Sequence, residues 1–186
     1  MRVKDSRSLH KLTLCALFAA LIAVLSPIAV PFGPIPVSLG LLGVLLTSLI
    51  LPPVRALTSV TVFLLLGICG LPVFGGGGSG AMILAGPTGG YLWSYLLVSL
   101  TVSLLSRRIG QRWQNQAAIR SGFVACLVGV LLCYLCGTLQ YALVMQTDPL
   151  AAIAVCVLPF LPFDVVKSLL AAYLSQKLKR ILGKRL

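Results

Sequence analysis

Asp164 and Lys167 are the residues of this sequence that are best placed to do chemistry. They are an acid and a base inside one apolar stretch, in a chain that has 15 Lys and Arg but only three acids. An ionisable group inside a bilayer costs at least about 2.5 kcal/mol, so it is retained where it has a partner or a function. A spacing of three places both groups on one face of a helix, about 5–6 Å apart. The pair can therefore be a self-neutralising buried ion pair, or it can hold a polar ligand.

The flanking residues predict where this pair sits on its helix. Pro159 and Pro162 are typical of a helix start, and a carboxylate in the first turn is favoured by the free N–H groups and the helix dipole. Lys177 lies 13 positions after Asp164, which is roughly 20 Å of helix. If Lys177 marks the inner interface, the pair lies in the outer half of an apolar core about 30 Å thick. We predict that it forms the wall or floor of an outward-facing pocket.

The elements that position the pair are apolar stretches. The composition is 59% apolar and 10% charged, which lies outside the averages for soluble domains. We predict an all-α membrane protein, a single domain over residues 1–186, in which the second, third and fourth stretches are short for a span of about 20 residues. The six predicted transmembrane helices cover residues 10–30, 35–52, 54–71, 88–106, 121–145 and 150–182.

The basic residues predict the topology. Fourteen of the 15 lie around the start of the first stretch, between the second and third, between the fourth and fifth, or around the end of the sixth. Under the positive-inside rule, this alternation predicts six crossings with both termini in the cytoplasm. The 14 residues are Arg2, Lys4, Arg7, Lys11, Arg55, Arg107, Arg108, Arg112, Arg120, Lys177, Lys179, Arg180, Lys184 and Arg185.

Several function classes are disfavoured. The net charge of +12 comes from basic residues that flank the predicted membrane spans. We therefore predict no nucleic-acid partner. All six cysteines lie in apolar stretches, and the Cys133-x-x-Cys136 spacing has no second pair and no nearby His, so we predict neither a metal site nor a disulfide framework. Three acids and one His, His10, make a poor set for an intramembrane enzyme, and we predict neither an enzyme nor a cofactor.

Two connections on the predicted outer side are unusual. Residues 26–36 contain four prolines and are otherwise apolar, so we expect a non-helical segment that packs into the protein. Residues 71–91 are rich in glycine, which permits positive φ and close approach of backbone to a ligand. A flexible tether between helices is one interpretation of this glycine segment; we favour a lid over a cavity. It is not a phosphate-binding loop, because no Lys-Ser/Thr follows the glycines.

Segments spread over residues 12–182 resemble the BioY family, the biotin-specific substrate-binding subunits of energy-coupling factor transporters. The most specific are the Gly-Pro-Thr-Gly-Gly-Tyr motif and the Asp-x-x-Lys helix. The segments are Pro36-Val-Ser-Leu39, Leu41-Leu-Gly-Val-Leu-Leu46, Gly67-Ile-Cys-Gly-Leu-Pro-Val-Phe-Gly-Gly-Gly-Gly78, Gly86-Pro-Thr-Gly-Gly-Tyr-Leu92 and Leu161-Pro-Phe-Asp-Val-Val-Lys167.

The resemblance implies a six-helix S-component fold with an outward-facing pocket that binds biotin with high affinity for uptake. It implies association with a membrane coupling subunit and two cytosolic ATPase subunits, in the cytoplasmic (inner) membrane of a prokaryote. Small-residue stripes on the first helix permit close helix approach in lipid, and we assign them to the coupling-subunit interface. The stripes are Ala16 with Ala20, and Ala19 with Ala23.

The expected ligand chemistry fits the pair. A ureido ring has two N–H donors and one carbonyl acceptor; Asp164 can accept from an N–H and Lys167 can donate to the carbonyl. A rival orientation pairs Lys167 with the valerate carboxylate. We favour the ureido arrangement, with apolar cover from aromatic side chains and the carboxylate near the glycine segment. The further substrate-binding candidates are Phe74, Tyr91, Thr88, Ser79, Ser38, Gly89 and Gly90.

The sequence departs from the family pattern at two positions. Family members often have Gln where Gly40 stands, and some have Asn at the position of Gly78. Each difference removes a hydrogen-bonding group, for which Ser79 or Ser38 can compensate. Two alternatives stay open: an S component for another vitamin, such as thiamine or riboflavin, and a solitary proton-coupled vitamin carrier with Asp164 as its proton site.

Overall fold

Helices form most of the computed structural model, which describes residues 2–32, 35–112 and 118–182. The predicted domain of residues 1–186 therefore has its two ends and residues 33–34 and 113–117 outside the described residues. The helices are α1 (Arg2–Leu25), α2 (Gly40–Ile50), α3 (Pro53–Ile68), α4 (Ala81–Ala85), α5 (Gly89–Arg112), α6 (Ala118–Met145), α7 (Pro149–Cys156) and α8 (Leu161–Leu182), with a short 3-10 turn η1 (Gly75–Gly77).

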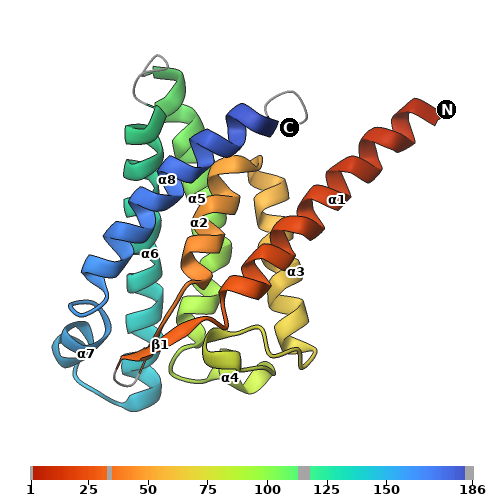
Figure 1. Ribbon diagram of the computed structural model, residues 1–186. Coiled ribbons are helices and arrows are strands. Elements are labelled where there is room, and N and C mark those ends of the chain that lie inside the picture. Colours follow the sequence, from red (N-terminus) through yellow and green to blue (C-terminus); the bar gives the residue numbers. More distant parts are fainter. Residues whose placement is uncertain (1, 33–34, 113–117, 183–186) are drawn as a thin grey trace.

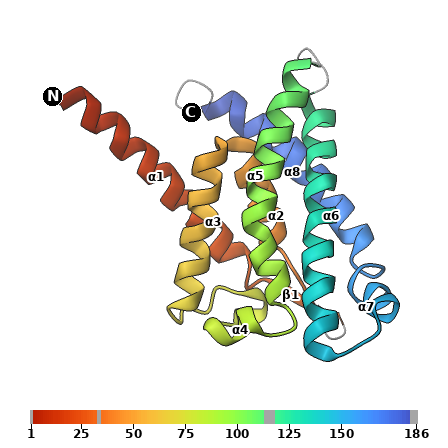
Figure 2. The ribbon, with the colours of Figure 1, turned by 180° about the vertical axis from the view of Figure 1, so that it is seen from behind.

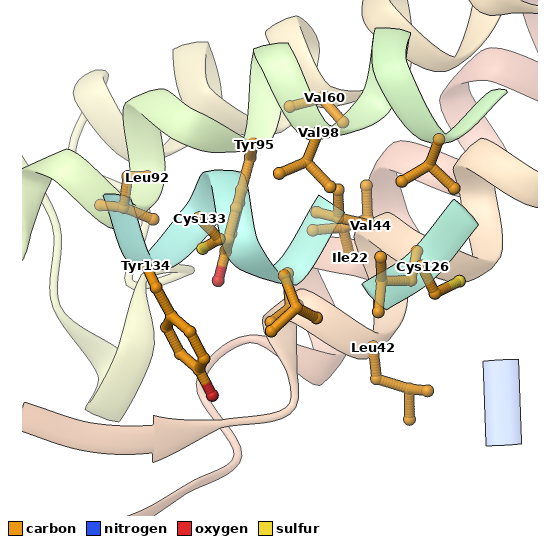
Figure 3. Close-up of a cluster of buried hydrophobic side chains, with 14 of the residues drawn as sticks. Ile22, Leu42, Val44, Val60, Leu92, Tyr95, Val98, Cys126, Cys133 and Tyr134 are labelled. Carbon is orange, nitrogen blue, oxygen red and sulfur yellow. The ribbon is translucent and has the colours of Figure 1, made fainter. Parts of the chain in front are cut away.

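The α2 helix lies at the centre of the molecule. All of its residues from Gly40 to Ile50 are buried, as expected of a helix that is apolar on every side. The helices α1, α3, α5, α6 and α8 surround it, with α5 and α6 side by side along their length and α8 crossing obliquely (Figures 1 and 2). Figure 3 shows the core where five of these helices meet, at Ile22, Val44, Val60, Val98 and Cys126.

The proline-rich connection forms a β-hairpin, which corrects the all-α expectation. Strand β1 (Ala29–Phe32) pairs antiparallel with β2 (Ile35–Ser38), and Ala29 lies opposite Ser38. Proline interrupts a helix, but it is tolerated on edge strands, where its missing N–H is not needed for a hydrogen bond to a neighbouring strand. Here Pro31 lies opposite Pro36. The hairpin occupies the first residues of the predicted span 35–52, so the helix there begins at Gly40.

The described helices satisfy the span prediction in part. The segments Gly89–Gly110 and Ala118–Met145 are each long and apolar enough to cross a membrane. The last predicted span is broken: α7 and α8 meet at an angle of 53° and together make a third candidate. Pro159 lies in the break, where it interrupts the helical hydrogen bonds. The segments Lys11–Leu25, Gly40–Ile50 and Pro53–Ile68 are apolar but shorter, so six crossings remain a prediction.

The helix ends gather at two opposite poles of the molecule. The start of α1, the α2–α3 junction, the end of α5, the start of α6 and the end of α8 lie at one pole (Figures 1 and 2). The hairpin, α4 and α7 lie at the other. The helix ends that carry the alternating basic residues of the sequence are therefore together, and we refer to them as the basic pole.

Candidate functional site

A cavity lies at the pole opposite the basic one, enclosed by the hairpin, the glycine segment and five helices. Its volume is about 100 Å³. Most of the lining is apolar, with a few polar groups among the apolar side chains. The lining residues are Ser26, Ile35, Pro36, Val37, Ser38, Leu41, Phe74, Gly75, Ile83, Thr88, Tyr91, Leu92, Tyr95, Cys133, Tyr134, Cys156, Phe160, Asp164 and Lys167.

The acid and the base form a buried ion pair in the cavity wall. Asp164 is 4% exposed and Lys167 is 8% exposed, and Lys167 Nζ lies 2.8 Å from Asp164 Oδ1. Within the described residues this is the only ion pair. Asp164 lies in the first turn of α8, as its sequence context predicts. Cys156 at the end of α7 and Phe160 in the break before α8 also line the cavity, so the bent segment and the first turn of α8 border it together.

Each member of the pair has a second partner. The Tyr134 hydroxyl of α6 donates to Asp164 Oδ2 over 2.7 Å, so both carboxylate oxygens accept a hydrogen bond. Lys167 Nζ also donates to the Ser38 carbonyl of the hairpin over 2.8 Å. An ammonium group has three donors, and these two bonds leave one for a ligand. Because an unpaired charge here would be costly, the network holds both charges in place before any ligand arrives.

Aromatic side chains form the apolar part of the wall. Tyr91 and Tyr95 lie one turn apart on α5, and Figure 3 shows the Tyr95 and Tyr134 rings with their hydroxyl ends on the side of the hairpin. Phe74 of the glycine segment is fully buried, and its ring packs edge-on against Phe63 at a centroid distance of 5.8 Å. The ring sits directly over Gly67, where a methyl group would overlap it.

The glycine segment is anchored over the cavity. The Gln140 side-chain amide of α6 donates to the carbonyls of Leu84 and Gly86, each over 2.8 Å. Phe74, Gly75, Ile83 and Thr88 all contribute to the lining. These contacts hold the glycine segment against the cavity, which is compatible with the predicted lid; the lid itself stays a prediction.

Six of the predicted site residues lie together in the lining: Asp164, Lys167, Ser38, Phe74, Thr88 and Tyr91. Ser79 is not in the lining. Gly89 and Gly90 are buried at helix contacts instead, where a side chain at Gly89 would overlap the Leu84 carbonyl and one at Gly90 the Cys136 carbonyl.

Sequence reasoning missed Tyr134, Tyr95 and Ser26. Tyr134 precedes Asp164 by 30 residues in an apolar stretch with no local pattern that marks it, so only the packing of α6 against α8 reveals it. Tyr95 could have been found, because it lies four residues after Tyr91 and hence on the same helix face.

The two departures from the family pattern lie next to the cavity. A side chain at Gly40 would start 2.8 Å from Ser26 Oγ and 3.1 Å from Ser38 Oγ, and one at Gly78 would run into Ile83. Ser26, Ser38 and Ile83 all line the cavity. The Ser38 hydroxyl accepts from the Gly40 N–H over 2.8 Å and donates to the Ser26 carbonyl over 2.6 Å, so its one donor is already used within the protein.

The two alanine stripes of α1 differ in exposure. Ala16 and Ala20 are exposed, whereas Ala19 is 1% exposed and Ala23 packs against the core. Only the Ala16–Ala20 stripe is therefore available to a partner helix in this conformation.

The sequence matches the BioY family over residues 1–184. The chain belongs to the BioY family. Among BioY relatives, "Biotin transporter BioY2" of Lactococcus lactis is 37% identical over 96% of this chain and 95% of its own length. "Biotin transporter BioY" of Thermotoga maritima is 32% identical over 93% and 98%. These proteins are transporters, and the BioY family is not one of enzymes.

A solved structure supports the same assignment. The crystal structure of the S-component for biotin from an ECF-type ABC transporter has a TM-score of 0.85 to this chain, with 26% identity. The likeness covers 95% of this chain and 94% of the other. The fold of this chain therefore matches that of an S component of known structure.

Proposed function

We propose that this chain binds biotin in the membrane as the substrate-specificity subunit of an energy-coupling factor transporter. The observation that carries the proposal is the buried Asp164–Lys167 pair in the cavity wall, with one N–H of Lys167 left for a ligand. Its support is the membership of the BioY family and the likeness to an S component for biotin.

The polar end of the cavity suits a ureido ring. Asp164 accepts from a ring N–H, since each carboxylate oxygen has a lone pair beyond the one used by its present partner. Lys167 donates its remaining N–H to the ring carbonyl. Phe74, Tyr91 and Tyr95 then cover the apolar bicycle, and the valerate carboxylate extends toward Thr88 and the glycine segment. In the rival orientation the carboxylate would meet Lys167 beside the negative charge of Asp164, which is less favourable.

The proposed topology has six crossings, with both termini and the basic pole in the cytoplasm of a prokaryote and the cavity on the outer side of the cytoplasmic (inner) membrane. Its support is the gathering of the basic helix ends at one pole (Figure 1) and the positive-inside rule. In this arrangement Ala16 and Ala20 face the lipid bilayer, where a membrane coupling subunit carrying two cytosolic ATPase subunits can dock.

Titration of biotin into the purified, detergent-solubilised protein by calorimetry tests the ligand assignment. We expect one-to-one binding with a nanomolar Kd, and no heat from thiamine or riboflavin. A monodisperse sample that binds either of those vitamins in place of biotin would contradict the proposal.

Uptake measurements separate the subunit from a solitary carrier. In cells that express the coupling and ATPase subunits, we expect biotin uptake to depend on ATP hydrolysis and to be lost when the ATPases are inactivated. Uptake that persists without the ATPases and collapses with the proton gradient would favour a proton-coupled carrier with Asp164 as its proton site.

Tyr134→Phe should weaken biotin binding about 5- to 10-fold, because Asp164 Oδ2 loses its hydroxyl donor and the carboxylate is less firmly oriented. Calorimetry on the two proteins measures the change. Tyr141→Phe is the control, since Tyr141 is a buried tyrosine of the same helix that does not line the cavity. Equal losses in both variants would show that Tyr134 has no special role.

A further inference from the structure

The Ser26 hydroxyl stands out among the buried polar groups. Ser26 follows the last residue of α1 and is 1% exposed. Its backbone is fully engaged: the N–H donates to the Ile22 carbonyl over 2.9 Å, and the carbonyl accepts from the Ser38 hydroxyl over 2.6 Å. Over residues 2–32, 35–112 and 118–182, no hydrogen bond joins its Oγ atom to the protein.

Most buried hydroxyls in this chain satisfy themselves locally. Thr47, Ser48 and Ser59, for example, each donate to the carbonyl four residues earlier, over 2.6–2.9 Å. In the described part of the chain, two hydroxyls sealed from solvent lack a partner, those of Thr138 and Ser168, and neither residue lines the cavity. Ser26 differs from both, because it lines the cavity and its Oγ retains accessible surface there.

The position of Ser26 indicates what its hydroxyl meets. A side chain at Gly40 would start 2.8 Å from Ser26 Oγ and 3.1 Å from Ser38 Oγ, so the two hydroxyls border the space that Gly40 leaves open. The Ser38 hydroxyl donates its hydrogen to the Ser26 carbonyl and accepts from the Gly40 N–H. The Ser38 carbonyl accepts from Lys167. The Ser26 hydroxyl and the third N–H of Lys167 are both donors in the cavity lining that have no partner among the described residues, and both groups belong to residues in contact with Ser38.

We propose that the Ser26 hydroxyl donates a hydrogen bond to the same ligand oxygen that Lys167 binds, which is the ureido carbonyl of biotin. A carbonyl oxygen has two lone pairs and can accept from both groups. This inference rests on the proposed function and adds Ser26 to the residues that bind the ureido ring. The Ser26 hydroxyl lies beside Gly40, which has no side chain to contribute a hydrogen bond there. The ligand carbonyl then gives the buried Ser26 hydroxyl the hydrogen-bond partner that buried polar groups generally have.

Calorimetry on Ser26→Ala and Ser168→Ala tests this assignment. Both changes remove a buried, unpartnered hydroxyl, and only Ser26 lines the cavity. We expect Ser26→Ala to weaken biotin binding about 10-fold, the effect of one buried hydrogen bond, and Ser168→Ala to leave the Kd unchanged. Biotinamide, which lacks the carboxylate but keeps the ureido ring, should show the same 10-fold loss in Ser26→Ala.

The outcomes separate this inference from the function on which it rests. A wild-type protein that does not bind biotin would overturn the proposed function. Wild-type binding together with an unchanged Kd in Ser26→Ala would overturn only the role of Ser26. A loss seen with biotin and absent with biotinamide would place the hydroxyl at the carboxylate and would overturn the ureido assignment.

Discussion

Asp164→Ala and Lys167→Ala will each reduce biotin affinity by roughly 2–5 kcal/mol, the range expected when one partner of a desolvated charge pair is truncated. Asp164 and Lys167 are almost fully buried, and their shortest contact is 2.8 Å. Part of the loss comes from the ligand bond that is removed. The rest comes from the surviving charge, which keeps its desolvation cost without its partner. Calorimetry on monodisperse protein measures both variants.

The double variant Asp164→Ala/Lys167→Ala separates the two contributions. It leaves no unpaired charge, so we expect its thermal unfolding midpoint to return toward that of the wild type while biotin affinity stays at least as low as in the single variants. If the double variant bound biotin as tightly as the wild type, the pair would have a purely structural role.

Gly90→Ala is expected to have the second large effect, through the contact between α5 and α6. A methyl group at Gly90 would lie 2.8 Å from Gln140 Cβ and 3.0 Å from Gly137 Cα, and would overlap the Cys136 carbonyl. Backbone cannot move aside as a flexible side chain can, so the helices must separate, at a cost of about 1–3 kcal/mol or more. The separation also moves Tyr91 on α5 relative to Tyr134 on α6, and we expect biotin affinity to fall by at least about 10-fold.

Gly110→Ala provides a control with the same chemical change on the same helix. The nearest atom to a methyl group there is Ser121 Oγ at 3.9 Å, an ordinary contact. Because alanine favours a helix over glycine by about 1 kcal/mol, the unfolding midpoint should stay the same or rise. Equal midpoints for Gly90→Ala and Gly110→Ala would rule out the close approach at Gly90 as a determinant of stability.

The sequence was most informative where a residue type is costly in its context. An acid and a base in an apolar stretch had to be paired or functional, and the structure places Asp164 and Lys167 in both a pair and the cavity wall. Prolines predicted the interrupted segments for the same reason, since proline removes a backbone donor wherever it stands. The non-helical connection after α1 and the helix start near Pro159 and Pro162 follow from this rule, although the predicted span of residues 150–182 did not include the break before α8.

The remaining features depend on which helices are neighbours, and local patterns do not contain that information. In the sequence, Gly90 is equally compatible with a ligand-binding loop and with a close contact between helices. Only the proximity of the Cys136 carbonyl on α6 shows that it lies at a helix contact. Tyr134 reaches Asp164 because α6 packs beside α8. The hairpin was missed because its four prolines indicate only the absence of a helix, whereas the pairing of Pro31 with Pro36 depends on the chain turning back on itself.

The partners of Asp164 and Lys167 also bear on which molecules the pocket rejects. The ion pair has no net charge, and its surrounding groups, the Tyr134 hydroxyl and the Ser38 carbonyl, are neutral. For a cation entering this end of the cavity, repulsion from Lys167 offsets attraction to Asp164, and for an anion the two terms are reversed. The site is thus electroneutral. A neutral ligand with polar groups pays a smaller desolvation free energy on entering it than a charged ligand does. In the proposed complex, a cyclic urea is admitted on this basis and a charged ring such as a thiazolium is excluded.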